Sequence, residues 1–150
     1  MSQSENTLFY HVAPKGLVSG SIIKPGAWGQ LIKAQDSFGP ISILEYLLEE
    51  IRLTQYSDKP SRLESVFALE TLQEAEYYRA NYAPLSSIYQ VTVDTTDLPL
   101  HRGNYDFGHP SGPKFIEQLH QTAALYWIQS DVQHVEILIP AAVKVVQRIS

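Results

Sequence analysis

The sequence predicts an α+β fold, a twisted and mainly antiparallel sheet with helices packed on it. Strand-like and helix-like segments mix along the chain without the regular strand–helix–strand order that parallel sheets require. The chain has 150 residues, of which 44% are hydrophobic and 18% are charged. This composition supports one buried core and excludes general disorder. We therefore expect residues 1–150 to form a single domain, with the polar residues 1–6 frayed.

The first half of the chain contains two predicted strands and one predicted helix. Aromatic and β-branched residues at 7–13 predict a strand that is covered on both faces. Residues 19–29 contain a Pro-Gly pair and predict a loop with short extended pieces. From residue 40 onward, apolar residues at three- and four-residue spacing predict a helix that ends before residues 57–61. Residues 64–69 then predict a second buried strand.

The second half opens with a helix in which Thr71 and Glu74 fit a capping box. Residues 95–112 are rich in proline and glycine and predict a long loop, and loops of this length are often functional. Pro113 suits the first turn of another helix. The remaining predicted elements are a strand at 87–94, a helix at 113–129, and two closing strands at 135–139 and 143–149.

Charge and cysteine content exclude several classes of function. The net charge is −5, which disfavours a protein whose main task is to bind nucleic acid. Because there is no cysteine, disulfide scaffolds, thiolate zinc sites, iron–sulfur clusters and cysteine nucleophiles are all excluded. No two of the five histidines have the i, i+4 spacing of a helical zinc pair, so we expect no metal. The glycine-rich signatures of nucleotide-binding loops are also absent.

No apolar run has the length of about 18 to 20 residues that a membrane span requires. Residues 1–6 have neither the basic nor the apolar segment of a secretory signal. We therefore expect a cytoplasmic protein without a membrane partner. Delivery as an effector by a route without a cleaved signal stays open.

Three polar residues stand in apolar surroundings. His11 lies in the middle of the first predicted strand, where it is either a hydrogen-bonded core residue or a ligand-binding group. Arg62 precedes a buried strand and could pair with the neighbouring helix or bind an anion with its planar fork. Glu136 points to the opposite face from Val135 and Ile137. If that face is covered, the carboxylate needs a partner or a function.

These places coincide with the motifs of a known family. Leu8–Ala13, followed by Gly20–Gly26, resembles the opening of rifampin ADP-ribosyltransferases. Ser65–Ala68 and the helix after it resemble the second motif of that family, and His134–Pro140 resembles the third motif of DNA-modifying ADP-ribosyltransferase toxins. In chain order they form the His–Tyr–Glu layout of the diphtheria-toxin-like branch. The resemblance spans nearly the whole chain and implies an ADP-ribosyltransferase-like fold.

Two further segments, Lys59–Arg62 and Ala124–Trp127, resemble an uncharacterised bacterial group that we place in the same superfamily. The chain also departs from the family pattern. Phe67 stands where the family has Tyr, so the ring is kept and the hydroxyl is lost. Val12-Ala13 replaces Gly-Thr after the first-motif histidine. The rifampin-modifying enzymes use an Asp as their acidic residue, and Asp94 or Asp97 could be compared with it.

The resemblance implies a mono-ADP-ribosyltransferase that transfers ADP-ribose from NAD to an acceptor and releases nicotinamide. Because toxins and effectors of the superfamily mostly modify proteins, an acceptor protein is favoured over a small molecule. The implied catalytic residues are His11, Phe67 and Glu136. The implied NAD-binding residues are His11, Val12, Ala13, Trp28, Arg62, Phe67 and Tyr78. The loop at 95–112, with His101, Arg102, Tyr105, Asp106 and Phe107, is either an acceptor-facing surface or a solvated connection with no role.

Two alternatives stay open. One is a catalytically silent domain of the same fold that binds NAD or another partner, which the change of Tyr to Phe67 favours. The other is an unrelated α+β domain whose motif matches are accidental. This last alternative predicts that His11 and Glu136 lie far apart.

Overall fold

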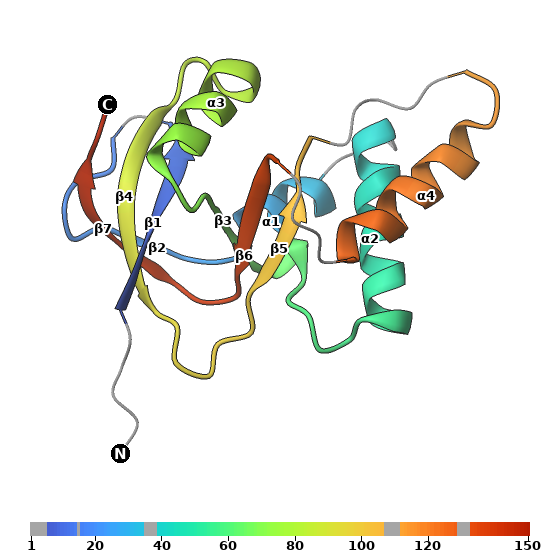
Figure 1. Ribbon diagram of the computed structural model, residues 1–150, viewed down its shortest axis with the longest axis horizontal. Coiled ribbons are helices and arrows are strands. Elements are labelled where there is room, and N and C mark those ends of the chain that lie inside the picture. Colours follow the sequence, from blue (N-terminus) through green and yellow to red (C-terminus); the bar gives the residue numbers. More distant parts are fainter. Residues whose placement is uncertain (1–5, 15, 35–38, 107–111, 129–132) are drawn as a thin grey trace.

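The computed structural model describes residues 6–14, 16–34, 39–106, 112–128 and 133–150 (Figure 1). Within these ranges the fold is α+β, as predicted, and its strands form two antiparallel sheets rather than one. The first sheet has the order β1-β4-β7-β2 and the second has the order β3-β6-β5. The strands are β1 (Asn6–Ala13), β2 (Ile22–Ile23), β3 (Val66–Ala68), β4 (Ser87–Asp94), β5 (His101–Asn104), β6 (Val135–Ile139) and β7 (Val143–Arg148). The helices are α1 (Ala27–Lys33), α2 (Pro40–Gln55), the 3₁₀ helix η1 (Arg62–Glu64), α3 (Leu72–Tyr82) and α4 (Phe115–Trp127).

The two sheets meet where β1 passes the end of β3. Tyr10 and Leu69 exchange both of their backbone hydrogen bonds, at 2.9 and 2.8 Å. This bridge places the residue after Tyr10 in β1 beside the middle of β3. Residues of the first and second predicted strands therefore become neighbours although more than fifty residues separate them along the chain.

β6 is the middle strand of the second sheet and is buried along its whole length. Val135, Ile137 and Ile139 pack into the core that the first sheet forms. Leu138, on the opposite face, packs against α2 and α4, which lie together on the far side of the second sheet (Figure 1). The alternation predicted for this strand is confirmed, and Glu136 lies on the face that the helices cover.

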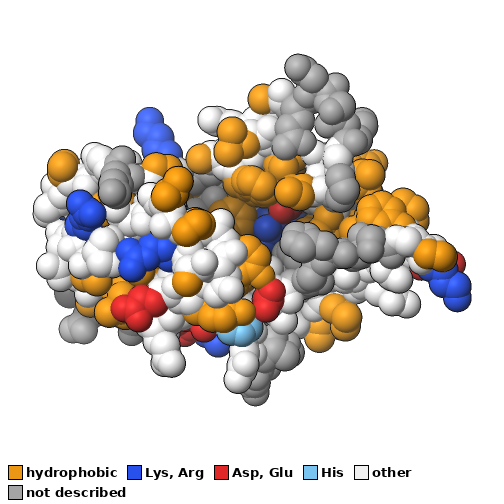
Figure 2. Space-filling model, turned by 90° about the horizontal axis from the view of Figure 1, so that it is seen from above, with side chains coloured by type: hydrophobic (Ala, Val, Ile, Leu, Met, Phe, Trp, Pro, Cys, Tyr) orange, Lys and Arg blue, Asp and Glu red, His pale blue; other side chains and the backbone are white. Residues whose placement is uncertain are grey.

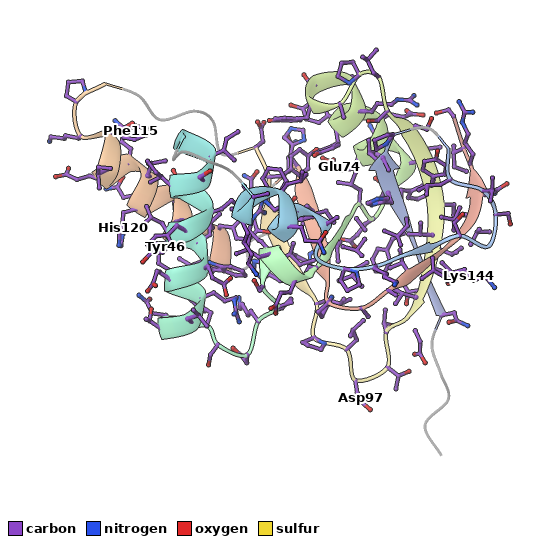
Figure 3. The ribbon with its side chains drawn as sticks, turned by 180° about the vertical axis from the view of Figure 1, so that it is seen from behind. Tyr46, Glu74, Asp97, Phe115, His120 and Lys144 are labelled. Atoms are coloured by element: carbon purple, nitrogen blue, oxygen red, sulfur yellow. The ribbon has the colours of Figure 1, made fainter. Side chains whose placement is uncertain are left out.

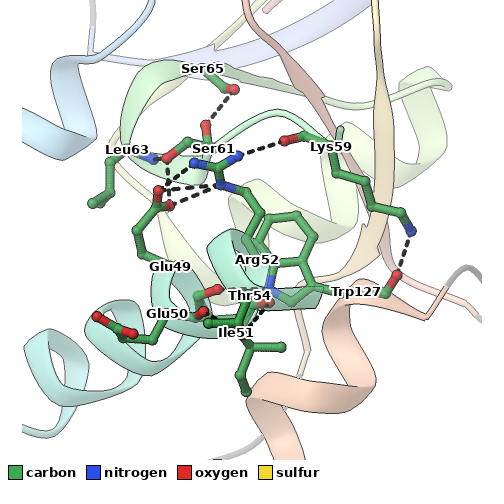
Figure 4. Close-up of polar contacts among 11 residues, drawn as sticks. Glu49, Glu50, Ile51, Arg52, Thr54, Lys59, Ser61, Leu63, Ser65 and Trp127 are labelled. Atoms are coloured by element: carbon green, nitrogen blue, oxygen red, sulfur yellow. Dashed lines mark hydrogen bonds and ion pairs between the residues drawn. The ribbon is translucent and has the colours of Figure 1, made fainter. Parts of the chain in front are cut away.

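The segment between α2 and η1 is held by a network of polar contacts (Figure 4). Arg52 forms an ion pair with Glu49 and donates to the carbonyl oxygen of Lys59 at 3.0 Å. Ser61 donates to Glu49 at 2.7 Å, and the Lys59 ammonium donates to the carbonyl oxygen of Trp127. These contacts fix the position from which η1 begins, and η1 begins with Arg62.

Most predicted elements are confirmed, and some bounds are wrong. Helix α1, at residues 27–33, begins within the predicted loop at 19–29, and residues 101–104 form β5 inside the predicted loop at 95–112. Asn6 belongs to β1 rather than to a frayed end, and α4 begins at Phe115 rather than at Pro113. β5 has the sequence His-Arg-Gly-Asn, which has no strand propensity of its own. It is a strand because it pairs with β6, with Gly103 opposite Glu136. Residues 1–5, predicted to be frayed, and residues 107–111 and 129, also part of these predictions, lie outside the described residues.

The helix at Thr71 has the predicted N-cap. The side chain of Thr71 accepts a hydrogen bond from the backbone N–H of Glu74 at 3.1 Å. The residues that follow form α3, which covers one end of β1 and β4 (Figure 1). The ring of Tyr78 on α3 makes an edge contact with the ring of Tyr105, directly after β5 in the second sheet.

Candidate functional site

A pocket of about 290 Å³ opens where β1, β3, β6, η1, α1 and α3 meet. Figure 2 shows a hollow in which basic and acidic atoms lie between hydrophobic side chains. The lining of the pocket has the same character, since it combines apolar walls with a few charged and polar groups. The lining residues are His11, Val12, Ala27, Trp28, Leu31, Arg62, Phe67, Ala68, Leu69, Tyr78 and Glu136.

The three residues expected to be catalytic line this one pocket. His11 comes from β1, Phe67 from β3 and Glu136 from β6. The bridge between β1 and β3 brings His11 to Phe67, and antiparallel pairing places Phe67 opposite Leu138, on the same sheet face as Glu136. His11 and Glu136 therefore line the same pocket, and the large separation that the unrelated-domain alternative predicts is not observed.

His11 is anchored through one of its ring nitrogens. Its Nδ1 lies 2.7 Å from the carbonyl oxygen of Phe67. A carbonyl oxygen can only accept, so Nδ1 carries the proton, and in the neutral ring Nε2 is an acceptor. Burial lowers the pKa of His11 below its ordinary value, although the hydrogen bond to Phe67 opposes the shift. Near neutral pH, His11 therefore presents a hydrogen-bond acceptor and no charge.

Glu136 is 5% exposed and has two partners. Arg62 donates to its Oε1, and the hydroxyl of Tyr126 donates to the same atom at 2.8 Å. Burial raises the pKa of Glu136 above its ordinary value, and both partners act against that rise because they stabilise the carboxylate. Glu136 is therefore a fixed carboxyl group in a site with little access to water.

Arg62 is shared by two carboxylates. Its Nε lies 3.0 Å from each carboxylate oxygen of Glu45 on α2, and its Nη2 lies 2.8 Å from Glu45 Oε1. The pairing of Arg62 with the neighbouring helix, one of the two interpretations drawn from the sequence, is thus observed. We call Glu45, Arg62 and Glu136 the charge triad. Two carboxylates and one guanidinium leave it with one excess negative charge when all are ionised.

This pairing bears on the second interpretation drawn from the sequence, that Arg62 binds an anion. The guanidinium is 7% exposed and already binds two carboxylates, so its charge is compensated within the protein. Its planar face also lies against two rings, with Cζ 4.9 Å from the centroids of Phe67 and Tyr126. The geometry makes Arg62 a positioning group for Glu136.

Aromatic side chains form the walls of the pocket. Trp28 on α1 donates its indole N–H to Glu45 Oε1 at 2.9 Å, which fixes the ring against the charge triad. Tyr78 on α3 lines the pocket from another element, and burial together with the nearby Glu136 charge raises the pKa of its hydroxyl. With Phe67, these rings reach the pocket from three separate elements.

Some residues expected at the site lie elsewhere. Ala13 follows Val12 in β1 and is not part of the pocket lining. Asp94 ends β4 and is exposed, and Figure 3 shows Asp97 at the tip of the turn after β4. Neither aspartate lines the pocket, so Glu136 is the acidic lining residue.

The expected acceptor-facing loop is in part a core segment. His101 and Tyr105 are 3% and 7% exposed, so they are not available as a surface. Arg102 is partly exposed and pairs with Glu70, and Asp106 is exposed and accepts from Tyr82. Phe107 lies outside the described residues.

Two residues of the site escaped sequence reasoning, Glu45 and Tyr126. A signal for Glu45 exists, because Leu48 and Glu49 stand three and four positions after it and Leu48 belongs to the apolar stripe of α2. A charged residue on such a stripe needs a buried partner. Tyr126 is placed by the packing of α4 on the second sheet, which no local pattern predicts.

Within the described part of the chain, no group of three or more His, Cys, Asp or Glu side chains could hold a metal ion. No described helix has both the length and the apolar character needed to cross a membrane. A comparison with curated proteins finds no match for the chain. A family model does match, over residues 30–150, and its description is a protein of unknown function, DUF2441. Because the match covers most of the chain, the protein belongs to the DUF2441 family.

Proposed function

We propose that the protein is a mono-ADP-ribosyltransferase that transfers ADP-ribose from NAD to an acceptor. The observation that carries the proposal is the shared pocket of His11, Phe67 and Glu136. These are the three residues that the family resemblance selects. They come from strands that are distant in the sequence, so an accidental resemblance would give no reason for them to share one cavity.

The reaction breaks the bond between C1′ of the ribose and N1 of nicotinamide. The bonding electron pair goes to N1, neutral nicotinamide leaves, and the ribose becomes an oxocarbenium-like cation. A nucleophile of the acceptor then forms a bond to C1′ and gives up its proton. The protein must therefore hold the nicotinamide ring, orient the ribose, and stabilise positive charge on the sugar.

Each requirement has a matching group in the pocket. The Phe67 and Tyr78 rings can enclose the nicotinamide. Neutral His11 can accept a hydrogen bond from a ribose hydroxyl through Nε2, because Nδ1 is committed to Phe67. Glu136 can stabilise the ribosyl cation, and a preorganised carboxylate in a site with little water can contribute several kcal/mol to the transition state.

The test is the rate of nicotinamide release and of label transfer from adenine-labelled NAD to candidate acceptor proteins. We expect Glu136→Gln to lower both rates by about 10² to 10³-fold. The matched control is Glu76→Gln, which neutralises an exposed glutamate of α3. Equal rates for wild type and Glu136→Gln would remove Glu136 from the mechanism and overturn the proposal.

The acceptor is proposed to be a protein. This part rests on the resemblance, because the pocket describes the donor side of the reaction. Mass spectrometry of a lysate treated with protein and NAD would identify ADP-ribosylated peptides, and their absence beside a modified small molecule would reverse the preference.

A second candidate is an NAD-binding domain that does not turn over. The observation that favours it is the ion pair between Arg62 and Glu136, which already compensates the charge that catalysis needs. Calorimetry with NAD and an assay for free nicotinamide separate the candidates. Binding without nicotinamide release supports the silent domain, and release supports the transferase.

A further inference from the structure

We infer that the pocket selects its ligand by charge, favouring a flat aromatic cation over a neutral or anionic ring, and that Glu45 is a specificity-determining residue. The inference deepens the proposed function, because it rests on that function for the identity of the ring as oxidised nicotinamide. It concerns Glu45, which the family resemblance does not include, and the charge balance of the triad to which Glu45 belongs.

The shape and walls of the pocket suit a flat ring. Trp28, Phe67 and Tyr78 approach it from α1, β3 and α3, so aromatic surfaces enclose the space from different directions. The faces of aromatic rings carry negative electrostatic potential and attract cations. The volume of about 290 Å³ is sufficient for a pyridine ring with a small substituent.

The charges near the pocket favour a cation as well. The charge triad has one excess negative charge when all three groups are ionised, and its members are 3%, 7% and 5% exposed in the order Glu45, Arg62, Glu136. Charges at such depth are screened little by salt or water. Arg62 and Glu136 are the charged groups among the lining residues, and His11 is neutral near neutral pH.

Glu45 determines the net charge of the triad, although it lies outside the pocket lining. It binds Arg62 through two nitrogens and accepts from the indole of Trp28. If Glu45 were neutral, Arg62 and Glu136 would form an isolated pair with no net charge. The excess negative charge that a bound cation would meet therefore depends on the Glu45 carboxylate.

The test uses three ligands with the same ring and different charges. They are 1-methylnicotinamide, which is a cation, nicotinamide, which is neutral, and nicotinate, which is an anion. Calorimetry on the wild-type protein at neutral pH should give affinities in that order. We expect the cation to bind about tenfold more tightly than nicotinamide, with little change in this ratio between low and physiological salt.

The variant Glu45→Gln isolates the proposed residue. We expect it to lower the ratio of cation to neutral affinity at least about fivefold and to leave nicotinamide binding nearly unchanged. A merely structural role would weaken both ligands together and leave the ratio intact. The matched control is Glu49→Gln. Glu49 lies about one turn after Glu45 in α2, and its carboxylate pairs with Arg52 and not with the triad.

Equal affinities for the three rings, or no binding of the cation at millimolar concentration, would overturn the charge selection on the unmodified protein. A Glu45→Gln protein that keeps the wild-type ratio would overturn the role of Glu45. If Glu45→Gln does not fold, the ligand series on wild type still decides the charge selection, and Trp28→Phe tests the link to Glu45 by removing the indole N–H. None of these ligands has a ribose to transfer, so the result is independent of whether NAD is cleaved.

Discussion

His11 Nδ1 lies 2.7 Å from the backbone carbonyl oxygen of Phe67, and this contact joins two strands from different sheets inside the pocket. It has two effects, because it fixes the ring of His11 and it determines which nitrogen carries the proton. Both effects depend on the bridge between Tyr10 and Leu69, which holds β1 against β3.

Replacing His11 by Phe keeps a ring of similar size and removes both nitrogens. Because the proposed acceptor for the ribose hydroxyl is lost, we expect nicotinamide release to fall about 10- to 100-fold. Initial rates at saturating NAD measure the effect. The control is His120→Phe, at an exposed position of α4 (Figure 3), and a His11→Phe protein as active as this control would contradict the assigned role.

The pH dependence of NAD cleavage should reflect two groups that act in their deprotonated forms. Burial lowers the pKa of His11 below 6.5 and raises the pKa of Glu136 above 4.5. Protonation of either group removes an acceptor or a negative charge, so kcat/KM should rise with pH and become constant once both are deprotonated. A rate profile from pH 5 to 9 would show this, and a rate that increases on acidification would contradict it.

His101 should make the fold sensitive to acid. Burial lowers the pKa of its ring from 6.5 to about 4, and its Nε2 donates to the carbonyl oxygen of Tyr126 at 3.0 Å. Between these pKa values the unfolded chain binds more protons, so stability present above pH 6.5 is lost as the pH falls. The loss from this residue between pH 7.5 and 4.5 should be about 2 to 3 kcal/mol in the free energy of unfolding.

Urea unfolding at the two pH values measures this loss. In His101→Gln, whose amide can still donate to Tyr126, the pH dependence should be smaller by that amount. The matched control, His120→Gln, changes an exposed histidine and should behave as wild type. If His101→Gln kept the full acid sensitivity of wild type, another group would be responsible.

Gly103 should tolerate no side chain. A Cβ at this position would lie 2.3 Å from Cε2 of the Tyr126 ring. Gly103→Ala would displace Tyr126 and weaken its hydrogen bond to Glu136, and we expect it to cost about 1 to 3 kcal/mol in the free energy of unfolding. Gly39→Ala is the control, because Gly39 has φ −104° and no atom within 4 Å of such a Cβ. Equal thermal midpoints for the two variants would contradict the close contact.

The sequence predicted the elements whose own pattern is strong. The strand at 87–94 has the bounds of β4 because its β-branched and aromatic residues favour a strand in any context. The helix α3 was also predicted, because the capping residue Thr71 marks its start in the sequence itself. β5 was missed because its four residues become a strand only through pairing with β6. Its Gly103 also leaves the space that the ring of Tyr126 occupies.

The candidate site was predictable to the extent that its residues break a local pattern. His11 and Glu136 are polar residues within apolar strands, so both attract attention in the sequence alone. Their meeting in one pocket depends on the order of strands and on the Tyr10–Leu69 bridge, which are non-local properties. The second carboxylate of Arg62 was missed for the same reason, since Glu45 reaches it across the contact between two helical segments.

The position of β6 and β7 in the two sheets has a consequence for synthesis of the protein. β6 is the middle strand of the second sheet, and β7 lies between β4 and β2 in the first. A nascent chain that has emerged from the ribosome only as far as β5 lacks two strands. It lacks β6, which lies between β3 and β5, and β7, which lies between β4 and β2. Glu136 also arrives with β6, so the lining of the pocket is incomplete until this strand has emerged.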